Sequence, residues 1–127
     1  MKYLQLFEDR LESLKKLAEL GLVDRDTLKV LDYMAGPMTG SLDLEDSALE
    51  TLPDGLVVGG NLFLNGSQIR TLPDGLVIAG DLDLEETRLE TLPARLRVGK
   101  DLFLSQSSIK SLPDDLTVGG KIYGFKP

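Results

Sequence analysis

The amino-acid sequence predicts a mainly β repeat solenoid of about 4.5 coils, preceded by an N-terminal cap of two α-helices. Two observations lead to this fold class. Residues 41–120 divide without a gap into four blocks of twenty residues, and a half block, 121–127, follows them. The chain before the blocks has apolar residues at helical spacing instead. We expect one folding unit, with a cap over 1–37 and a solenoid over 38–127.

The cap is predicted from three-and-four spacing of apolar residues, which is typical of amphipathic helices. A first helix over 2–21 would bury Leu4, Phe7, Leu11, Leu14, Leu17 and Ala18, and Gly21 would end it. Asp24 or Asp26 can cap a second, shorter helix. Its buried side would hold Leu28, Leu31 and Tyr33 or Met34, and Gly36-Pro37 would end it.

The four blocks 41–60, 61–80, 81–100 and 101–120 share the template x-L-x-L-x-x-[ST]-x-[LI]-x-[ST]-L-P-x-x-L-x-[VI]-[GA]-[GK]. The L-x-L segment has the period of a β-strand, with both leucines inward and the middle residue outward. Proline suits the corner that follows, because it has no backbone N–H to donate a hydrogen bond to a neighbouring strand. The apolar columns of one block cannot be buried by that block alone, so stacked coils must share one core.

Residues 42–53 carry a resemblance to a known family. Their sequence, L-D-L-E-D-S-A-L-E-T-L-P, resembles the core of leucine-rich repeats, and the next blocks match likewise. The nearest variants are short bacterial and phage repeats of the L-P-x-x-L-x-V-G-G-x-L-x-L type. The resemblance covers residues 38–127. It implies a right-handed solenoid whose strand face binds another protein, and it implies no catalysis.

Two departures from the family leave a second architecture open. The family's asparagine is replaced by Ser47, Ser67, Thr87 and Ser107. Their hydroxyl groups would therefore have to form hydrogen bonds with the backbone polar groups of the turn. Gly59 stands where the family has a leucine, three residues before Leu62. The convex side could therefore hold its own short strand near 56–58, as in a two-sided β-solenoid. The right-handed leucine-rich-repeat-like form is favoured.

Both ends of the repeat region differ from its interior. Met38-Thr39-Gly40 resembles the Val-Gly-Gly that ends the first block, so the cap is expected to join the solenoid in register. At the other end, Gly124 replaces the second leucine of the strand. Lys121, Lys126 and Pro127 lie where an open edge would invite pairing.

Two outward columns follow from the register. Glu50, Arg70, Glu90 and Lys110 alternate in sign along the stack, and we expect surface ion pairs of ~0–1 kcal/mol each.

The outward residue of L-x-L is in turn Asp43, Phe63, Asp83, Phe103 and Tyr123. Exposed apolar groups rimmed by charge mark interaction sites. We predict that this column binds a partner together with Glu45, Glu85, Glu86 and Asp101. Alternatively, the aromatic rings pack on one another or under the N-terminal helices.

Composition narrows the function further. The chain has no His, Cys or Trp, and its 21 acidic and 14 basic side chains give a net charge of −7. Without His or Cys it lacks the commonest general base, metal ligand and thiol nucleophile. We expect no enzyme activity, no catalytic residue, no cofactor and no metal site. The acidic balance argues against direct nucleic-acid binding, which needs a basic footprint. A calcium site is disfavoured because the acidic spacing fits no calcium-loop motif.

The sequence thus predicts a non-enzymatic protein-interaction module whose partner has a basic surface. Charged residues by position eight leave no signal peptide, and no apolar run is long enough for a membrane span. We expect a cytoplasmic protein of a bacterium or an infected host cell. One alternative is a phage-type inhibitor or nucleic-acid mimic that blocks a bacterial defence or regulatory complex. Another is a structural protein that assembles with itself, for instance as a homodimer.

Overall fold

The computed structural model describes residues 12, 15–16, 19–21 and 24–126. The chain forms two compact units, Met1–Met38 and Thr39–Pro127. The first predicted helix, over residues 2–21, falls mostly outside the described residues. Of those that are described, Glu12, Lys15, Lys16 and Glu19 have helical backbone.

The second predicted helix is α2, Arg25–Ala35. Asp24 is its N-cap, because one carboxylate oxygen accepts the Thr27 amide hydrogen bond at 2.8 Å and the other accepts the Thr27 hydroxyl at 2.7 Å. Gly36 is the C-cap, as expected. The predicted buried side needs correction. Val30 is the buried residue of α2, whereas Leu28, Leu31, Tyr33 and Met34 are half-buried.

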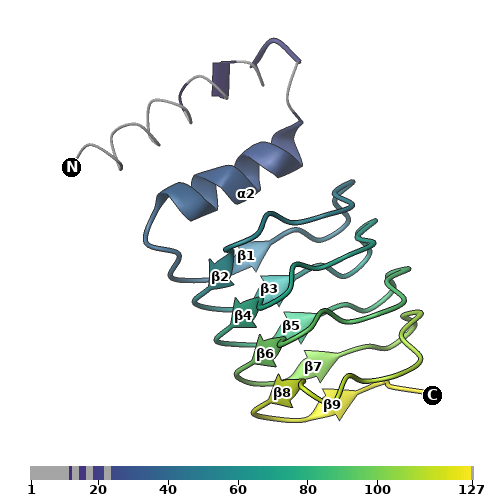
Figure 1. The fold of residues 1–127 in the computed structure, drawn as a ribbon. Coiled ribbons are helices and arrows are strands. Elements are labelled where there is room, and N and C mark those ends of the chain that lie inside the picture. Colours follow the sequence, from purple (N-terminus) through teal and green to yellow (C-terminus); the bar gives the residue numbers. More distant parts are fainter. Residues whose placement is uncertain (1–11, 13–14, 17–18, 22–23, 127) are drawn as a thin grey trace. The chain divides into compact units, whose positions relative to one another are not determined.

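The second unit is a β-solenoid of about four turns, in which each coil contributes short strands to two parallel sheets (Figure 1). The first sheet has the order β1-β3-β5-β7-β9, from the L-x-L segments Leu42–Asp43, Leu62–Phe63, Leu82–Asp83, Leu102–Phe103 and Ile122–Tyr123. The second sheet has the order β2-β4-β6-β8, from Val57–Val58, Val77–Ile78, Arg97–Val98 and Thr117–Val118. Paired residues in both sheets are twenty positions apart.

The second sheet confirms the strand that the sequence left open on the side opposite the L-x-L segments. The strand expected as an alternative near 56–58 is present in every full coil, so this is a two-sided solenoid. Its inward residues are Val58, Ile78, Val98 and Val118, one on each strand. Alternation explains this arrangement, because each two-residue strand turns one side chain inward and the other outward.

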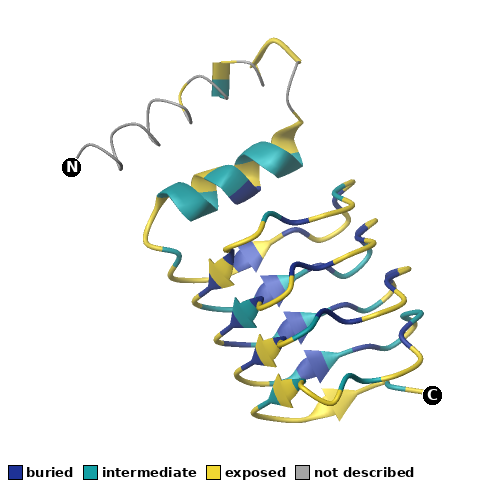
Figure 2. Ribbon diagram, in the orientation of Figure 1, coloured by how far each residue is buried: buried dark blue, intermediate teal, exposed yellow. Residues whose placement is uncertain are grey.

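The core lies between the two sheets (Figure 2). The two leucines of each L-x-L segment are buried in the first four coils, and Leu62, Leu64, Leu82 and Leu84 are fully enclosed. Burial decreases in the last coil. Leu112, Leu116 and Val118 are half-buried, and 37% of Ile122 is exposed. The end of the stack lacks the next coil that covers every interior coil.

A ladder of side-chain acceptors joins successive coils at the first position of each block. Ser41 accepts a hydrogen bond from the Asn61 amide, Asn61 from the Asp81 amide, Asp81 from the Asp101 amide and Asp101 from the Lys121 amide, at 2.8–2.9 Å. The ladder needs close approach between coils. A Cβ on Gly80 would overlap the Asn61 Oδ1 atom, and one on Gly120 would overlap the Asp101 Oδ1 atom.

The turn after each L-x-L segment is closed mainly by backbone. The amides of Ser47, Ser67 and Ser107 donate to the carbonyl three residues earlier, at 3.0–3.2 Å. The expectation that hydroxyls satisfy this turn holds for Thr87, whose Oγ1 donates to the Leu84 carbonyl at 2.8 Å. It is wrong for Ser47 and Ser67, whose buried Oγ atoms have no hydrogen-bond partner among the described residues.

Candidate functional site

The candidate site is the outward face of the first sheet. Its central column runs from Asp43 through Phe63, Asp83 and Phe103 to Tyr123, and each residue is paired in register with the next. Phe63, Asp83 and Phe103 are half-buried, Asp43 is exposed, and Tyr123 has 42% of its surface exposed. The structure therefore brings the five residues together in one line, as the strand period predicts.

The aromatic rings of the column do not form one continuous stack. Phe103 and Tyr123 stack, with ring centroids 5.2 Å apart and an angle of 11° between their planes. Phe63 is separated from this pair by Asp83, which lies on the strand between them. The alternative that the aromatic residues pack on one another thus applies to Phe103 and Tyr123.

The two aspartates of the column are held in the same way. Asp43 Oδ1 accepts the hydrogen bond of the Glu45 amide at 3.1 Å, and Asp83 Oδ1 accepts that of the Glu85 amide at 3.0 Å. Each bond spans two residues and restrains the carboxylate against its own strand end. The two sites differ in their neighbours, because Asp83 lies between two phenylalanines and Asp43 lies beside one.

The remaining predicted residues surround the column with different roles. The Glu45 carboxylate accepts a hydrogen bond from the Asn65 side chain at 2.8 Å. Glu85 is half-buried beside Asp83, and Glu86 is exposed with a φ of 56°. Asp101 belongs to the acceptor ladder, because its Oδ1 atom holds the Lys121 amide. Asp101 therefore has a structural task in addition to any part in binding.

The acceptor ladder was not predicted, although the sequence carries a signal for it. The first position of the four blocks is Ser, Asn, Asp and Asp, and each has a short side chain with an acceptor oxygen. The half block begins with Lys121, which has no acceptor. The negative charge of Asp101 by itself predicts a place on the binding face. Only the contact between coils distinguishes an acceptor from a surface charge.

The predicted charge column is formed in part. The Arg70 Nε atom lies 3.4 Å from the Glu50 Oε1 atom, and both side chains are more than half exposed. Among the described residues, Glu90 and Lys110 form no ion pair with a neighbour in this column. A shallow hollow nearby is lined by Ser67, Arg70, Glu86, Arg88 and Glu90 among others, with both charge signs mixed.

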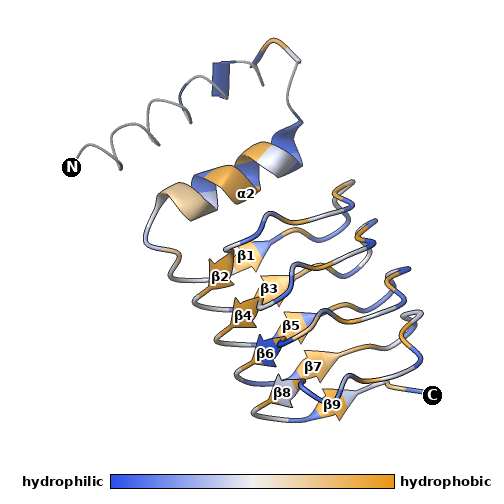
Figure 3. Cartoon of the chain, in the orientation of Figure 1, coloured by the Kyte–Doolittle hydropathy of each residue, from blue (hydrophilic) through white to orange (hydrophobic). Residues whose placement is uncertain are grey.

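The second sheet presents a different outward face. Its outward residues are Val57, Val77, Arg97 and Thr117, so the face changes from apolar to hydrophilic at β6 (Figure 3).

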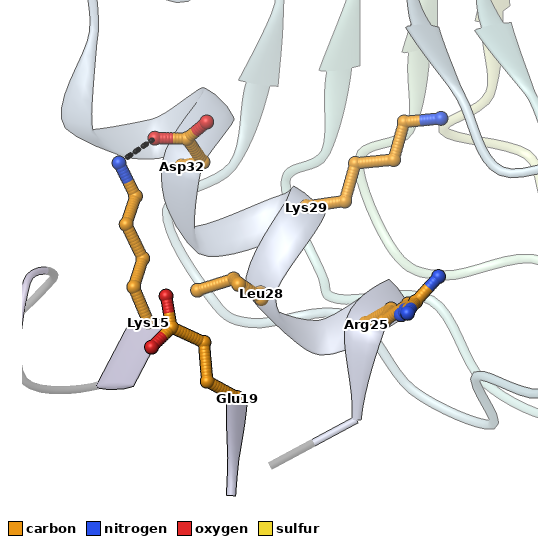
Figure 4. Close-up of a pocket in the computed structure, with 6 residues that line it drawn as sticks. All are labelled: Lys15, Glu19, Arg25, Leu28, Lys29 and Asp32. Carbon is orange, nitrogen blue, oxygen red and sulfur yellow. Dashed lines mark ion pairs between the residues drawn. The ribbon is translucent and has the colours of Figure 1, made fainter. Parts of the chain in front are cut away.

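The first unit has a hollow of its own, drawn in Figure 4. The Lys15 ammonium there lies 3.7 Å from the Asp32 carboxylate, and both side chains are well exposed. Such a solvated pair contributes ~0–1 kcal/mol.

The part of the chain that the structure describes holds no group of three or more acidic side chains arranged for a metal ion. Within the same residues, no helix has the length and apolar character needed to cross a membrane. Comparison with protein-family models, curated proteins and solved structures finds no match to this chain.

Proposed function

We propose that this protein is a non-enzymatic interaction module that binds a protein with a basic surface through the outward face of the first sheet. The observation that carries the proposal is the position of Phe63 and Phe103. Both rings lie on a face that points away from the core, in register with carboxylates. Aromatic side chains are typical anchors of interfaces. The acidic rim would steer a basic partner toward them.

The charge distribution supports the same partner. Residues 37–127 carry eight basic and fourteen acidic side chains, so −6 of the net charge of −7 belongs to this part of the chain. The resemblance to leucine-rich repeats, with its right-handed form and strand-face binding, is part of this proposal. So is a cytoplasmic location in a bacterium or an infected host cell.

The test is capture of a partner from bacterial lysate by the full chain and by two double variants. In the first, Phe63→Ser and Phe103→Ser remove the aromatic rings of the first sheet. In the matched control, Val57→Ser and Val77→Ser remove outward apolar side chains from the second sheet. We expect the wild type and the control to retain the same protein and the first variant to lose it. Circular dichroism establishes that each variant is folded.

The opposite pattern would overturn the proposal. Retention by the folded Phe63→Ser/Phe103→Ser variant would show that the first sheet is not the binding face. Should that variant unfold, Asp83→Lys provides a second variant that leaves both rings in place. A partner with a basic surface would be lost from Asp83→Lys, and its full retention would contradict the proposal.

The salt dependence of partner binding distinguishes this function from nucleic-acid mimicry. A mimic would hold its partner through charge, so raising the salt from about 0.15 M to about 1 M should release it. Anchoring by Phe63 and Phe103 predicts that a substantial part of the captured protein remains bound, because burial of apolar area is not screened by salt.

A second candidate function, assembly with another copy, is favoured by the last strand. β9 ends the first sheet, and its residues Ile122 and Tyr123 have 37% and 42% of their surface exposed. An unpaired sheet edge is a template for pairing with another chain. Lys121 and Lys126 oppose this at the same edge. Sedimentation equilibrium of the wild type and of Ile122→Lys tests it, with a lower average mass for the variant expected if the edges pair.

A further inference from the structure

On the outward face of the first sheet, one phenylalanine lies on either side of one aspartate, and we refer to Phe63, Asp83 and Phe103 together as the slot. Phe63 and Phe103 flank Asp83 on the neighbouring strands, and the register places all three side chains on the same side of the sheet. Adjacent strands are ~4.8 Å apart, so the two phenylalanines are ~10 Å apart along the stack. A phenylalanine ring reaches farther from the backbone than an aspartate carboxylate. The Asp83 carboxylate is therefore expected to lie closer to the sheet than the outer edges of the two rings.

The dimensions of the slot suit a cation. A cation that contacts the Asp83 carboxylate from outside would lie above the middle strand, ~5–6 Å from each ring and inside the ~6 Å range of cation–π attraction. Asp83 Oδ1 accepts the hydrogen bond of the Glu85 amide at 3.0 Å, and Oδ2 is the second acceptor of this carboxylate. Phe103 is supported from behind by its stack with Tyr123, so one wall of the slot is braced.

The chemistry favours arginine over lysine as the occupant. A guanidinium group is planar, can lie against an aromatic face on either side and can donate to a carboxylate at its edge. It is also more weakly hydrated than an ammonium group, so it loses less on leaving water. Asp81 and Glu85, which lie on the same coil as Asp83, add negative charge around the slot.

We propose that the slot formed by Phe63, Asp83 and Phe103 binds an arginine side chain of the partner protein. This inference rests on the proposed function, since it names the chemical group by which the partner is recognised. Asp43 provides a matched control within the same column. Its carboxylate is held by the same kind of bond, Glu45 amide to Asp43 Oδ1, but one aromatic ring lies beside it instead of two.

The experiment is an NMR titration of the full chain with N-acetyl-arginine amide and, separately, N-acetyl-lysine amide, at constant ionic strength. A ligand of this size is expected to bind with a Kd on the order of a millimolar. We expect saturable shifts at Phe63, Asp83 and Phe103 with the arginine probe, and weaker binding of the lysine probe. Asp83→Asn and Phe103→Leu should each weaken arginine binding about fivefold or more. Asp43→Asn, whose carboxylate lies beside one aromatic ring instead of two, should weaken arginine binding less than Asp83→Asn does.

Three results would overturn the inference: shifts that do not saturate, equal binding of the two probes, or equal losses in Asp83→Asn and Asp43→Asn. Asparagine keeps the Oδ1 acceptor for the strand-end amide, so both aspartate variants are designed to retain the local fold. Failure of this inference is distinguishable from failure of the proposed function. A partner captured through the first sheet without arginine binding in the slot would leave the function standing and refute the arginine site.

Discussion

At the residue scale, the backbone places particular demands on two recurring positions of the coils. The sixth residue of each block and the fifteenth residue of the first three blocks have positive φ. Glycine holds three of these places, Gly55, Gly66 and Gly75, with φ between 71° and 85°. Arg95 holds an equivalent place with a φ of 55°, and it is exposed. A side chain with a Cβ is unfavourable in this region by ~1–2 kcal/mol.

Replacing Arg95 with glycine is therefore expected to stabilise the solenoid. The relief of backbone strain is offset in part by the greater flexibility of glycine in the unfolded chain, so the net gain should be about 0.5–1 kcal/mol. The Arg95 amide, which donates to the Asp115 carboxylate at 3.0 Å, is kept in the variant. Urea denaturation measures the change in the free energy of unfolding.

Arg97→Gly is the control for this prediction. Arg97 is also exposed, but it lies in strand β6 and has no positive φ. Glycine in a strand interior should cost ~0.5–1 kcal/mol. Stabilisation by both substitutions would point to loss of positive charge as the cause and would refute the argument from backbone conformation.

At the scale of elements, the acceptor ladder holds coil to coil where the first sheet begins. Asp81 lies in the middle of the ladder, with its Oδ1 atom 2.9 Å from the Asp101 amide. Asn61 makes the same kind of bond one coil earlier. The function of the position is thus to supply an acceptor, for which a negative charge is not required.

We predict that Asp81→Ala lowers the free energy of unfolding by about 1–2 kcal/mol, because a part-buried amide loses its acceptor. Asp81→Asn should lose less than half as much. Thermal and urea denaturation of the two variants measure the difference. Equal losses would mean that the charge of Asp81, and not its acceptor oxygen, supports the fold.

The N-terminus of α2 gives a pH-dependent prediction at the same scale. Hydrogen bonds from the Thr27 amide and hydroxyl lower the pKa of Asp24 below its usual value of 3.8. A carboxylate whose pKa is lowered by folding stabilises the folded form above the unfolded pKa. That contribution is lost as the pH falls through the folded pKa. The cap should therefore hold at neutral pH and weaken below about pH 3.8.

The amide chemical shift of Thr27 measures this titration. In the wild type we expect it to change with a midpoint below 3.8. Asp24→Asn should retain the cap and flatten the curve, whereas Asp24→Ala should lower the stability of α2 by about 0.5–2 kcal/mol. A Thr27 shift that still titrates in Asp24→Asn would show that another acid is responsible.

At the scale of the whole molecule, the two ends of a stack are not equivalent to its middle. Each interior coil is covered on both sides, whereas the last coil is covered on one. Leu96 is fully buried, and Leu116, the same position one coil later, is half-buried. In a solenoid, stability is approximately the sum of contributions from each coil and its neighbours.

We therefore expect Leu96→Ala to cost about 2–5 kcal/mol and Leu116→Ala to cost clearly less. Hydrogen exchange should follow the same gradient, with faster exchange at Thr117 and Gly119 than at Arg97 and Gly99. Equal costs for the two leucine variants would indicate that residues beyond 120 cover the last coil as fully as another coil would.

Much of the fold was predictable because the period is regular. The coil length of twenty, the pairing of residues twenty apart and the inward leucines of each L-x-L segment follow from the repeat and from strand alternation. The outward position of Phe63 and Phe103 follows from the same alternation. The buried side of α2 was predicted incorrectly. Helical spacing allowed several choices, and burial of Val30 depends on tertiary packing.

The sequence by itself determined the length of the coil, its register and the face on which the aromatic and acidic residues lie. These depend on spacing along one chain. Only the tertiary structure decided that each full coil has a second strand, that the first position of each block is an acceptor ladder, and that the Phe103 ring stacks on Tyr123. The physical reason is that hydrogen bonds and contacts between coils join residues twenty apart, and their partners are defined only when the coils are stacked.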